Sequence, residues 1–299
     1  MEDFKNVINS CKNFKQEAIS ILGVEQSVFE LEEHHGLYDM AILTANIDEF
    51  DSVKNILDGF KRIISNENDS TLYYSGKISS STKTYKVIVP LPYSMGIEAS
   101  SALTTKVVGT FRPKYLFMCG ICAGNKKIVK IGDVVIAEKS LNYHSIVNID
   151  RKDTTKDKKL MHQISSINGN LKSQLELLTR SASINKIFDK YSNKTHLEPN
   201  LRCHLGLLVT GSSLVRSSKV MEEINSTYPG VKGLDMETYG LYYACTQVFK
   251  DYAPNFVSIK AVSDYGDEKN QDLSPLDRRK YGLYTSSSIL KLFLTNFLE

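Results

Sequence analysis

Short apolar runs alternate with longer segments of helical periodicity along most of this 299-residue chain. The apolar runs that predict strands are 40–43, 71–74, 85–89, 115–119, 132–138, 205–209, 231–234 and 256–261. The segments that predict helices are 47–60, 97–111, 160–190 with a break near 168–169, 219–225, 238–249 and 278–298. Strands that alternate with helices are typical of a mainly parallel sheet covered on both faces. The pattern therefore predicts an α/β fold.

Ahead of this alternating region, apolar residues recur at helical spacing over residues 4–22. The spacing breaks at 26–36, which reads as an acidic connector. We therefore expect an N-terminal helical extension over residues 1–37 and one domain over residues 38–299. The apolar face of that helix must pack on something, either the main domain, a second subunit or a docking partner.

The composition excludes several classes of protein. Apolar residues make up 41% of the chain, and 37 Lys and Arg against 34 Asp and Glu give a formal charge of +3. Nucleic-acid-binding chains usually carry a stronger basic bias, and no apolar run approaches the roughly 20 residues of a membrane-spanning helix. The first residues also lack the basic start and apolar core of a signal peptide. We expect a cytoplasmic protein that binds neither nucleic acid nor membrane.

The five cysteines are an odd number and are widely scattered, which argues against a disulfide scaffold. Cys119 and Cys122 have the spacing of a redox motif, but they follow an apolar run without an obvious helix after them. A tight turn of small residues is the favoured interpretation. No second pair of ligands has the spacing of a zinc site, so we predict no metal site.

Acidic residues follow two of the predicted strands directly. Asp235 and Glu237 come after 231–234, and Asp264 comes after 256–262. The ends of strands are where open α/β sheets hold their ligands. Carboxylates there can accept hydrogen bonds from sugar hydroxyls and protonate a leaving group, which is the chemistry of cleaving a bond at an anomeric carbon.

Small residues at Gly120–Gly124 follow another predicted strand. The segment matches neither a phosphate-binding P-loop nor the dinucleotide fingerprint. It is either a tight turn or a backbone that a ligand approaches closely.

Taken together, five segments resemble the purine nucleoside phosphorylase/nucleosidase superfamily, most of all its 5′-methylthioadenosine/S-adenosylhomocysteine nucleosidase branch. They are Ala41–Ala45 with Glu49, Gly120–Gly124, Ile131–Ile136 with Asn142–His144, Asp235–Glu237, and Lys260–Asp264. The resemblance covers roughly residues 38–298. It implies a mixed, mainly parallel sheet flanked by helices, an N-glycosidase activity that needs no cofactor, and a homo-oligomer.

The resemblance also implies roles for individual residues. Glu49 matches the glutamate that activates the attacking water, and Asp264 matches the acid that protonates the departing purine at N7, with Ser263 orienting it. Glu237 matches the carboxylate that binds the ribose hydroxyls. The other matched substrate-binding positions are Gly120, Ile121, Leu214, Val215 and Met236.

Purely structural roles remain open for the acidic residues. Glu49 would favour the dipole of the helix that begins near it. Asp235 or Glu237 could cap the following helix, and the capping role is the favoured one for Asp235. Asp264 could belong to a turn.

Water is predicted as the nucleophile because the arginines that hold phosphate in bacterial phosphorylases are missing. Phe117–Cys119 occupies the place of one, and no arginine follows Ala45. A phosphate dianion needs charge-assisted donors, and Glu49 would repel it. The alternatives are a phosphorylase with a rearranged phosphate site and an inactive nucleotide-binding sensor.

Two departures from the family pattern leave the substrate open. Leu214 stands where the nucleosidases place an aromatic residue that stacks on adenine, so stacking is either weaker or comes from elsewhere, such as Tyr265 or a tyrosine outside these segments. The basic run 151–159 is either a solvated loop or a cover over the pocket mouth that holds a 5′-phosphate chain. Relatives in bacterial anti-phage systems cleave nucleotides, so the sequence allows a purine nucleoside or a nucleotide, the latter in a defence effector.

Overall fold

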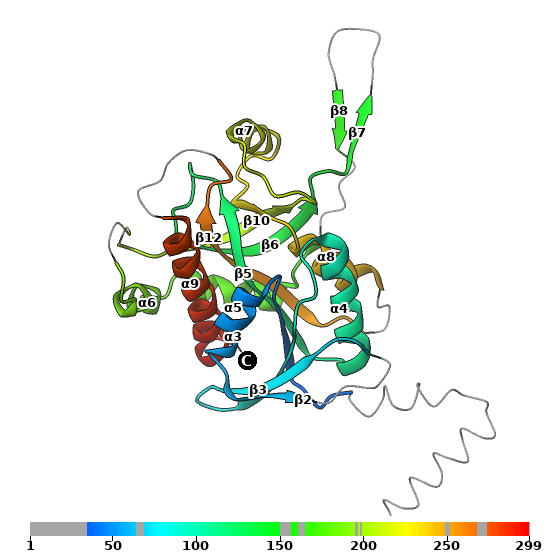
Figure 1. Cartoon of the computed structure of the whole chain (residues 1–299), viewed down its shortest axis with the longest axis vertical. Helices are drawn as coiled ribbons and strands as arrows, with labels where there is room; N and C mark the ends of the chain where they lie inside the picture. Colours follow the sequence, from blue (N-terminus) through cyan, green and yellow to red (C-terminus); the bar gives the residue numbers. More distant parts are fainter. Residues whose placement is uncertain are drawn as a thin grey trace, which may run out of the picture.

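The computed structural model describes residues 35–63, 69–149, 157–160, 165–194, 197, 199–248, 252–267 and 274–298. At its centre is a ten-stranded sheet with the order β11-β10-β6-β12-β5-β1-β4-β3-β2, to which β9 adds at β6 (Figure 1). The strands are β1 (Met40–Leu43), β2 (Asp58–Ile63), β3 (Tyr73–Ser79), β4 (Thr84–Pro90), β5 (Tyr115–Gly124), β6 (Val134–Asn142), β9 (Ser165–Ser166), β10 (Cys203–Thr210), β11 (Gly233–Asp235) and β12 (Asn255–Asp264).

The sheet is mixed, which confirms the predicted α/β class. Strand β1 runs parallel to β4 and β5, and β5 runs parallel to β12. Strands β2, β3 and β4 pair antiparallel at one edge, and β12 pairs antiparallel with β6. The central strands β1 and β5 read as nearly continuous apolar runs because they are buried on both faces.

Helices cover both faces of this sheet. They are α3 (Ile47–Lys54), α4 (Ile97–Phe111), α5 (Gly169–Thr179), α6 (Ser183–Lys190), α7 (Ser218–Thr227), α8 (Thr238–Tyr243) with a π-helical turn at Ala244–Val248, and α9 (Pro275–Asn296). Helix α9 packs against β12, β5 and α3, whereas α4 and α8 pack on each other on the opposite side (Figure 1). The buried contact of Phe117 on β5 with Phe293 on α9, ring centroids 6.1 Å apart, joins the sheet to its longest helix.

The helix predicted over 47–60 is too long. Helix α3 ends at Lys54, and the chain enters β2 at Asp58. Gly59 has a φ of +61°, which a right-handed helix cannot accommodate. Phe60 then stacks on Tyr74 of β3 with centroids 5.3 Å apart, so pairing with the next strand of the chain overrides the local helical periodicity.

Two further predictions of local structure are wrong. The described residues of 160–168 are not helical: they include β9, and helix α5 begins only at Gly169, where the Asn168 side chain accepts a hydrogen bond from the Leu171 amide. The segment Gly120–Gly124 is not a loop but the second half of β5. It stays in the sheet because it pairs with β12, Gly120 opposite Lys260.

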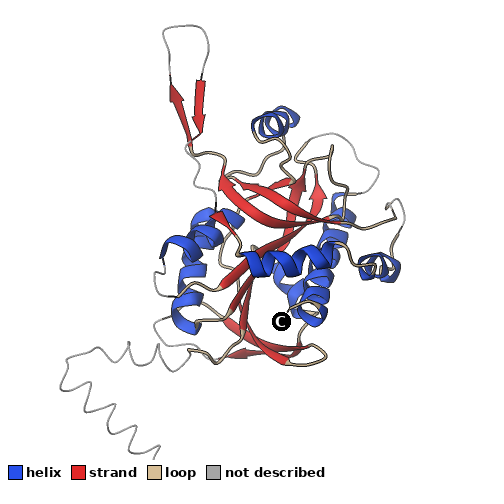
Figure 2. Cartoon of the chain, turned by 180° about the vertical axis from the view of Figure 1, so that it is seen from behind, coloured by secondary structure: helices blue, strands red, loops and turns tan. Residues whose placement is uncertain are grey.

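Some predictions fall on residues that the structure does not describe. The helix over 4–22 and the basic residues 151–156 lie outside the described residues. On either side of the latter, β7 (Ile146–Ile149) and β8 (Asp157–Leu160) form an antiparallel hairpin that extends away from the main sheet (Figure 2). No helix in the described part of the chain is long and apolar enough to cross a membrane.

Candidate active site

A cavity of about 450 Å³ opens where β1, β5 and β12 end. These strands are parallel, so their carboxyl ends meet at one edge of the sheet. Eight of the nine predicted site residues line this cavity: Glu49, Ile121, Leu214, Val215, Met236, Glu237, Ser263 and Asp264. They come from segments up to 215 residues apart in the sequence (49 to 264), and the fold brings them together.

Glu49 is held in place by two backbone amides, one just after β1 and one within β5. Asn46 caps α3 by accepting a hydrogen bond from the Glu49 amide, which puts Glu49 in the first helical turn. Its carboxylate accepts hydrogen bonds from the amides of Ala45 (2.7 Å) and Ile121 (2.9 Å). Although only 1% exposed, Glu49 lines the cavity. Its carboxylate therefore bonds to the amides of Ala45 and Ile121 in addition to any favourable effect on the helix dipole.

Gly120, the ninth predicted residue, lies behind Glu49 and does not line the cavity. A Cβ at this position would lie 2.2 Å from Oε1 and 2.3 Å from Cδ of Glu49. The glycine is needed for the close approach of the carboxylate to the strand. In the structure, Gly120 therefore has a packing role: it makes room for the Glu49 carboxylate.

Glu237 lies just before α8, with its carboxylate buried. Its Oε1 accepts a hydrogen bond from the Gly96 amide at 3.2 Å. Burial raises the pKa of Glu237 to about 7, Lys260 opposes that rise, and the nearby carboxylates of Asp235 and Glu49 add to it. A carboxyl that titrates near neutral pH is typical of functional sites.

Lys260 is the site residue that sequence reasoning missed. It is fully buried on β12, and its Nζ lies 3.4 Å from Glu237 Oε2, 3.8 Å from Asp235 Oδ2 and 3.9 Å from Glu49 Oε1. Burial alone would lower the pKa of Lys260, but the three carboxylates raise it above its ordinary value, so the side chain stays charged. The signal available in the sequence was a single lysine inside the apolar run 256–262. A lysine is almost never fully buried unless it is paired, so a lysine in a buried strand indicates acidic partners.

Asp235 has the capping role that the sequence favoured. One of its carboxylate oxygens accepts a hydrogen bond from the Thr238 amide at 3.0 Å, and the other accepts one from the Thr210 hydroxyl at 2.7 Å. These bonds tie β11 to the start of α8 and to β10. Asp235 therefore sets the position from which Glu237 reaches the cavity.

Asp264 terminates β12 at the cavity wall. Its Oδ2 accepts a hydrogen bond from the Ser263 hydroxyl at 2.9 Å, and its Oδ1 accepts one from the Gly266 amide at 2.8 Å. The contact with Ser263 is the one expected of an orienting residue. The bond to Gly266 shows that Asp264 also stabilises the turn that follows the strand.

The wall on which a base would pack is aliphatic. Leu214, Val215 and Met236 line the cavity, and no aromatic residue is among the described residues that line it. Tyr265 packs against the hydrophobic core instead, so it is not the stacking partner considered from the sequence. Leu214 is 69% exposed, which leaves this wall open toward solvent.

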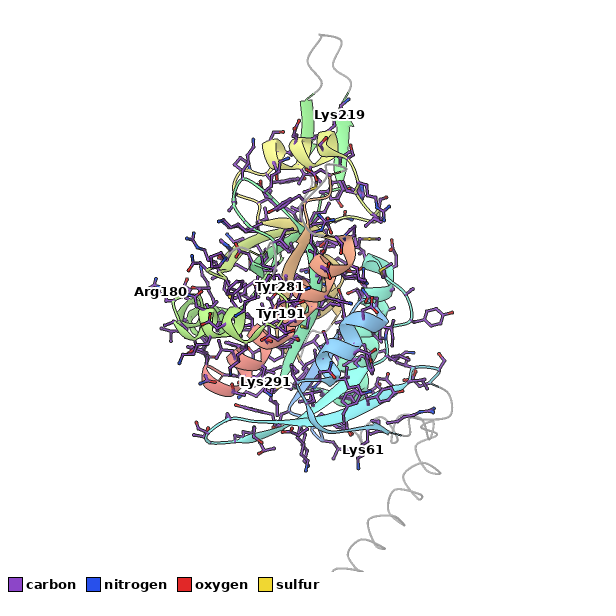
Figure 3. The ribbon with its side chains drawn as sticks, turned by 60° about the vertical axis from the view of Figure 1, so that its left-hand side comes forward. Lys61, Arg180, Tyr191, Lys219, Tyr281 and Lys291 are labelled. Carbon is purple, nitrogen blue, oxygen red and sulfur yellow. The ribbon has the colours of Figure 1, made fainter. Side chains whose placement is uncertain are left out.

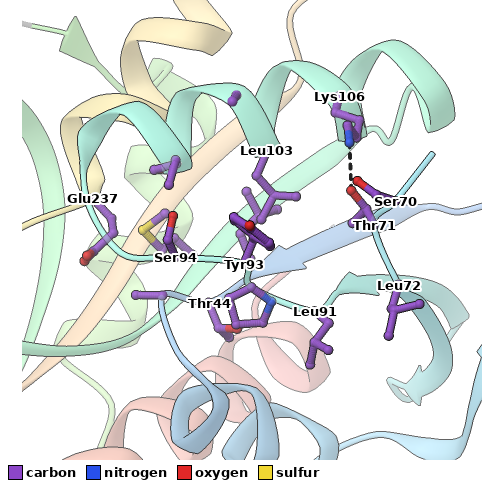
Figure 4. Close-up of a pocket in the computed structure, with 17 residues that line it drawn as sticks. Thr44, Ser70, Thr71, Leu72, Leu91, Tyr93, Ser94, Leu103, Lys106 and Glu237 are labelled. Carbon is purple, nitrogen blue, oxygen red and sulfur yellow. Dashed lines mark hydrogen bonds between the residues drawn. The ribbon is translucent and has the colours of Figure 1, made fainter. Parts of the chain in front are cut away.

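A second cavity, of about 380 Å³, adjoins the first and shares Ala45 and Glu237 with it. It lies between α4 and the ends of β1 and β4, and Lys106 at its far end donates a hydrogen bond to the Thr71 hydroxyl at 2.8 Å (Figure 4). Most of its lining is apolar. The buried hydroxyls of Thr44 and Ser100 line it and have no hydrogen-bond partner among the residues that the structure describes.

Three arginines also line the first cavity: Arg216, Arg278 and Arg279. None of them lies at Phe117–Cys119 or directly after Ala45, the two positions that correspond to the phosphate-binding arginines of the bacterial phosphorylases. Among the described residues, no group of three His, Cys, Asp or Glu side chains is arranged to hold a metal ion.

The arrangement suits cleavage of a bond that builds positive charge on one side and negative charge on the other. Glu49 and Glu237 present carboxylate oxygens to the cavity, and Asp264 presents a carboxyl from a different strand. Carboxylates stabilise a developing cation, and a carboxylic acid neutralises a departing anion. Because the cavity is partly enclosed by protein, these interactions are stronger than they would be in water.

Comparison with known proteins gives the same picture of the fold. The family model described as the phosphorylase superfamily matches residues 39–295. A 5′-methylthioadenosine/S-adenosylhomocysteine nucleosidase from Neisseria meningitidis, solved with methylthio-immucillin-A, superposes with a TM-score of 0.64 at 21% identity over 86% of this chain and 99% of that one. Futalosine hydrolase of Helicobacter pylori superposes with a TM-score of 0.61 at 16% identity, covering 85% and 96% of the two chains.

Relatives by sequence include two kinds of nucleosidase. A 5′-methylthioadenosine/S-adenosylhomocysteine nucleosidase of Buchnera aphidicola is 26% identical over 73% of this chain and 84% of its own length. A death domain-containing ATP nucleosidase of Amphimedon queenslandica and ATP nucleosidase Cap17 of Escherichia coli are each 24% identical, over 71% and 77% of this chain. The matched segments span only 40% and 46% of those two proteins.

Proposed function

The chain belongs to the phosphorylase superfamily, and from this premise we propose that it is an N-glycosidase that uses water to release the base from a purine nucleoside or nucleotide. The observation that carries the proposal is the convergence of Glu49, Glu237 and Asp264, from three distant segments, on one cavity. The sequence relatives named as nucleosidases support the same reaction.

In this proposal Glu49 is the general base. The amides of Ala45 and Ile121 occupy one lone pair on each of its oxygens and fix the carboxylate at the cavity wall. Glu49 takes a proton from water as the water oxygen bonds to the anomeric carbon. Lys260, 3.9 Å from Glu49 Oε1, limits the repulsion between this carboxylate and Glu237.

Asp264 is the general acid and Glu237 the ribose-binding residue. As the C–N bond breaks, its electron pair moves to the purine, and Asp264 donates a proton to N7 of the base. Glu237 accepts hydrogen bonds from the ribose hydroxyls, and its charge stabilises the oxocarbenium character of the sugar. Met236, Leu214 and Val215 pack on the sugar and base, and Ile121 borders them. Hydrolysis leaves free base and free sugar.

Phosphorolysis is the rival within the superfamily. The fixed carboxylate of Glu49 favours water, because a phosphate dianion next to it would be repelled. The test is to incubate the protein with purine nucleosides and nucleotides, with and without inorganic phosphate, and to analyse the products. We expect free base at the same rate in both conditions, together with free sugar from a nucleoside or the sugar 5-phosphate from a nucleotide. A sugar 1-phosphate formed only when phosphate is present would overturn the proposal.

A binding protein without activity is the rival from another class. If no base is released from any purine nucleoside or nucleotide while these compounds still bind, the sensor alternative replaces the enzyme. Measuring base release and binding with the same panel of compounds distinguishes the enzyme from the sensor.

The assembly of the chain is a separate part of the proposal. Large apolar side chains beside the cavities are exposed, among them Tyr93 (99%), Met95 (57%) and Ile47 (54%). Such a patch is typical of an interaction surface, and we propose that the chain forms a homo-oligomer and that residues 1–37 are an extension that docks a partner or a second subunit. Light scattering on the full chain and on a chain lacking residues 1–37 tests both statements. Cytoplasmic localisation stays a prediction.

A further inference from the structure

The charges that line the candidate active-site cavity are divided between two regions. The carboxylates of Glu49, Glu237 and Asp264 lie at the ends of strands or just after them. The arginines lie elsewhere: Arg278 and Arg279 in the first turns of α9, and Arg216 on the segment between β10 and α7. The cavity therefore has an acidic floor and a basic rim.

The position of Arg278 is not explained by an ion pair with any residue that the structure describes. It is partly buried, its Nε is fully buried without a hydrogen-bond partner, and it forms no ion pair within the described residues. The nearby carboxylate of Asp277 accepts a hydrogen bond from the Ser274 hydroxyl at 2.7 Å. A buried guanidinium donor without an acceptor is costly unless a ligand supplies the acceptor.

The other two arginines differ in how far they are neutralised. Arg279 contacts Asp48 at 3.0 Å and donates a hydrogen bond to the Asn46 side chain at 3.3 Å, beside the start of α3. Arg216 is exposed and makes no ion pair with any residue that the structure describes. The rim also holds Asp267, but Lys126 neutralises it at 3.1 Å. Within the described part of the chain, the rim thus carries positive charge at Arg278 and Arg216 that no ion pair neutralises.

From this distribution we infer that the basic rim binds the 5′-phosphate groups of a purine nucleotide, so that nucleoside 5′-phosphates, rather than unphosphorylated nucleosides, are the preferred substrates. The inference rests on the proposed hydrolase function. Guanidinium groups bind phosphate by paired charge-assisted hydrogen bonds. A cavity of about 450 Å³ is within the size range of sites for ligands larger than a nucleoside.

The orientation of the sugar agrees with this assignment. With its 2′- and 3′-hydroxyls on Glu237 and its base near Asp264, the 5′ carbon points away from Glu237. Asn46 and Arg279 border the cavity beside Glu49, on the α3 side, and Pro275 and Arg278 continue that border along α9. A phosphate chain leaving the 5′ carbon in that direction meets guanidinium groups and not the carboxylates of the floor.

The test compares phosphorylated and unphosphorylated substrates in wild type and three variants. Base release is measured for adenosine, inosine and guanosine and for their 5′-mono-, di- and triphosphates, with Arg278→Gln, Arg278→Lys and Arg180→Gln. Arg180 is the matched control because it follows α5, far from the cavity lining, at the periphery in Figure 3. Binding of inorganic tripolyphosphate to the same proteins is measured by calorimetry as a readout that needs no turnover.

In the wild type, kcat/KM for a nucleotide is expected to exceed that for its nucleoside. Arg278→Gln should lower the nucleotide-to-nucleoside ratio of kcat/KM about 10-fold or more, since a hydrogen bond to a charged group contributes at least that much. The ratio for Arg278→Lys should lie between those of the wild type and Arg278→Gln, because lysine keeps the positive charge but lacks the planar guanidinium group. Arg180→Gln should leave the ratio and the tripolyphosphate affinity unchanged.

The two proposals can fail separately. If nucleosides and nucleotides are cleaved with equal kcat/KM and Arg278→Gln alters both alike, the phosphate assignment is overturned while the hydrolase stands. If no compound releases its base, the hydrolase proposal fails, and calorimetry still tests whether the basic rim binds phosphate. Tripolyphosphate binding that weakens in Arg278→Gln supports this assignment. No tripolyphosphate binding to the wild type overturns it.

Discussion

Lys260 Nζ lies 3.4 Å from Glu237 Oε2, and neither side chain has appreciable contact with solvent. The same ammonium is within 4 Å of Glu49 and Asp235, so one buried cation is shared by three carboxylates. Without it, two of the proposed functional carboxylates would repel each other in a medium of low dielectric. The pair therefore links the stability of the fold to the charge state of the site.

Replacing Lys260 should be strongly destabilising. Lys260→Met leaves three buried carboxylates without their cation, and breaking a buried ion pair typically costs about 3–5 kcal/mol. Urea unfolding measures this loss. Lys291→Met is the control, because Lys291 is an exposed residue on α9 and its replacement should change the free energy of unfolding by less than about 0.5 kcal/mol. Equal midpoints for the two variants would contradict the proposed role of Lys260.

The activity should depend on the ionisation of Glu237. Its pKa is raised to about 7, so the carboxyl is mostly protonated below that pH and mostly ionised above it. The ionised form accepts hydrogen bonds from both ribose hydroxyls and stabilises the cationic sugar, so the ionisation of Glu237 should raise kcat/KM with pH through about 7.

This pH dependence is checked by a profile of kcat/KM between about pH 5 and pH 9, with folding monitored at each pH. A 13C label on glutamate side chains would follow the carboxyl directly. A rate that is flat across the window, or a midpoint near the ordinary glutamate value, would show that Glu237 is ionised throughout.

Gly120→Ala should inactivate the protein without unfolding it. The added Cβ would lie 2.2 Å from Glu49 Oε1, so the carboxylate must leave the amides of Ala45 and Ile121. Since the base would be displaced from its position, we expect kcat to fall by about 100-fold or more. Base release and a far-ultraviolet circular dichroism spectrum measure the two properties.

Gly109 provides the matched control for that substitution. It lies within α4, and a Cβ there would meet nothing within 4 Å. Gly109→Ala should therefore keep activity and raise the free energy of unfolding by about 0.5–1 kcal/mol, as expected when a helical glycine becomes alanine. Full activity in Gly120→Ala would show that Glu49 need not be held where the structure places it.

Glu49→Gln and Asp264→Asn should separate chemistry from binding. Each removes a proton-transfer group while keeping the shape of the side chain, so kcat should fall by about 100-fold to 10,000-fold and ligand affinity should change little. Glu176→Gln on the exposed surface of α5 serves as the control. Stopped assays of released base and calorimetry with a bound nucleotide give the two quantities. Retention of wild-type turnover in either variant would remove that residue from the proposed mechanism.

Much of the fold could be predicted from local patterns. The apolar run 40–43 is β1 and the amphipathic segment 97–111 is α4, because burial on one or both faces imposes a periodicity that is readable in a short window. The position of Glu49 in the first turn of α3 follows likewise from the capping residue Asn46. Prediction failed at Phe60 and at Gly120–Gly124, where pairing with another strand decided the structure.

The sequence by itself determined the class of fold, the family resemblance and the acidic residues that follow its strands. Only the tertiary structure decided that Lys260 is shared among Glu49, Asp235 and Glu237, that Gly120 makes room for the Glu49 carboxylate, and that α9 brings Arg278 to the cavity rim. The physical reason is the separation along the chain over which each effect acts. Periodicity and capping act within a few residues, whereas these contacts join segments that are adjacent only because β5 and β12 pair in one register.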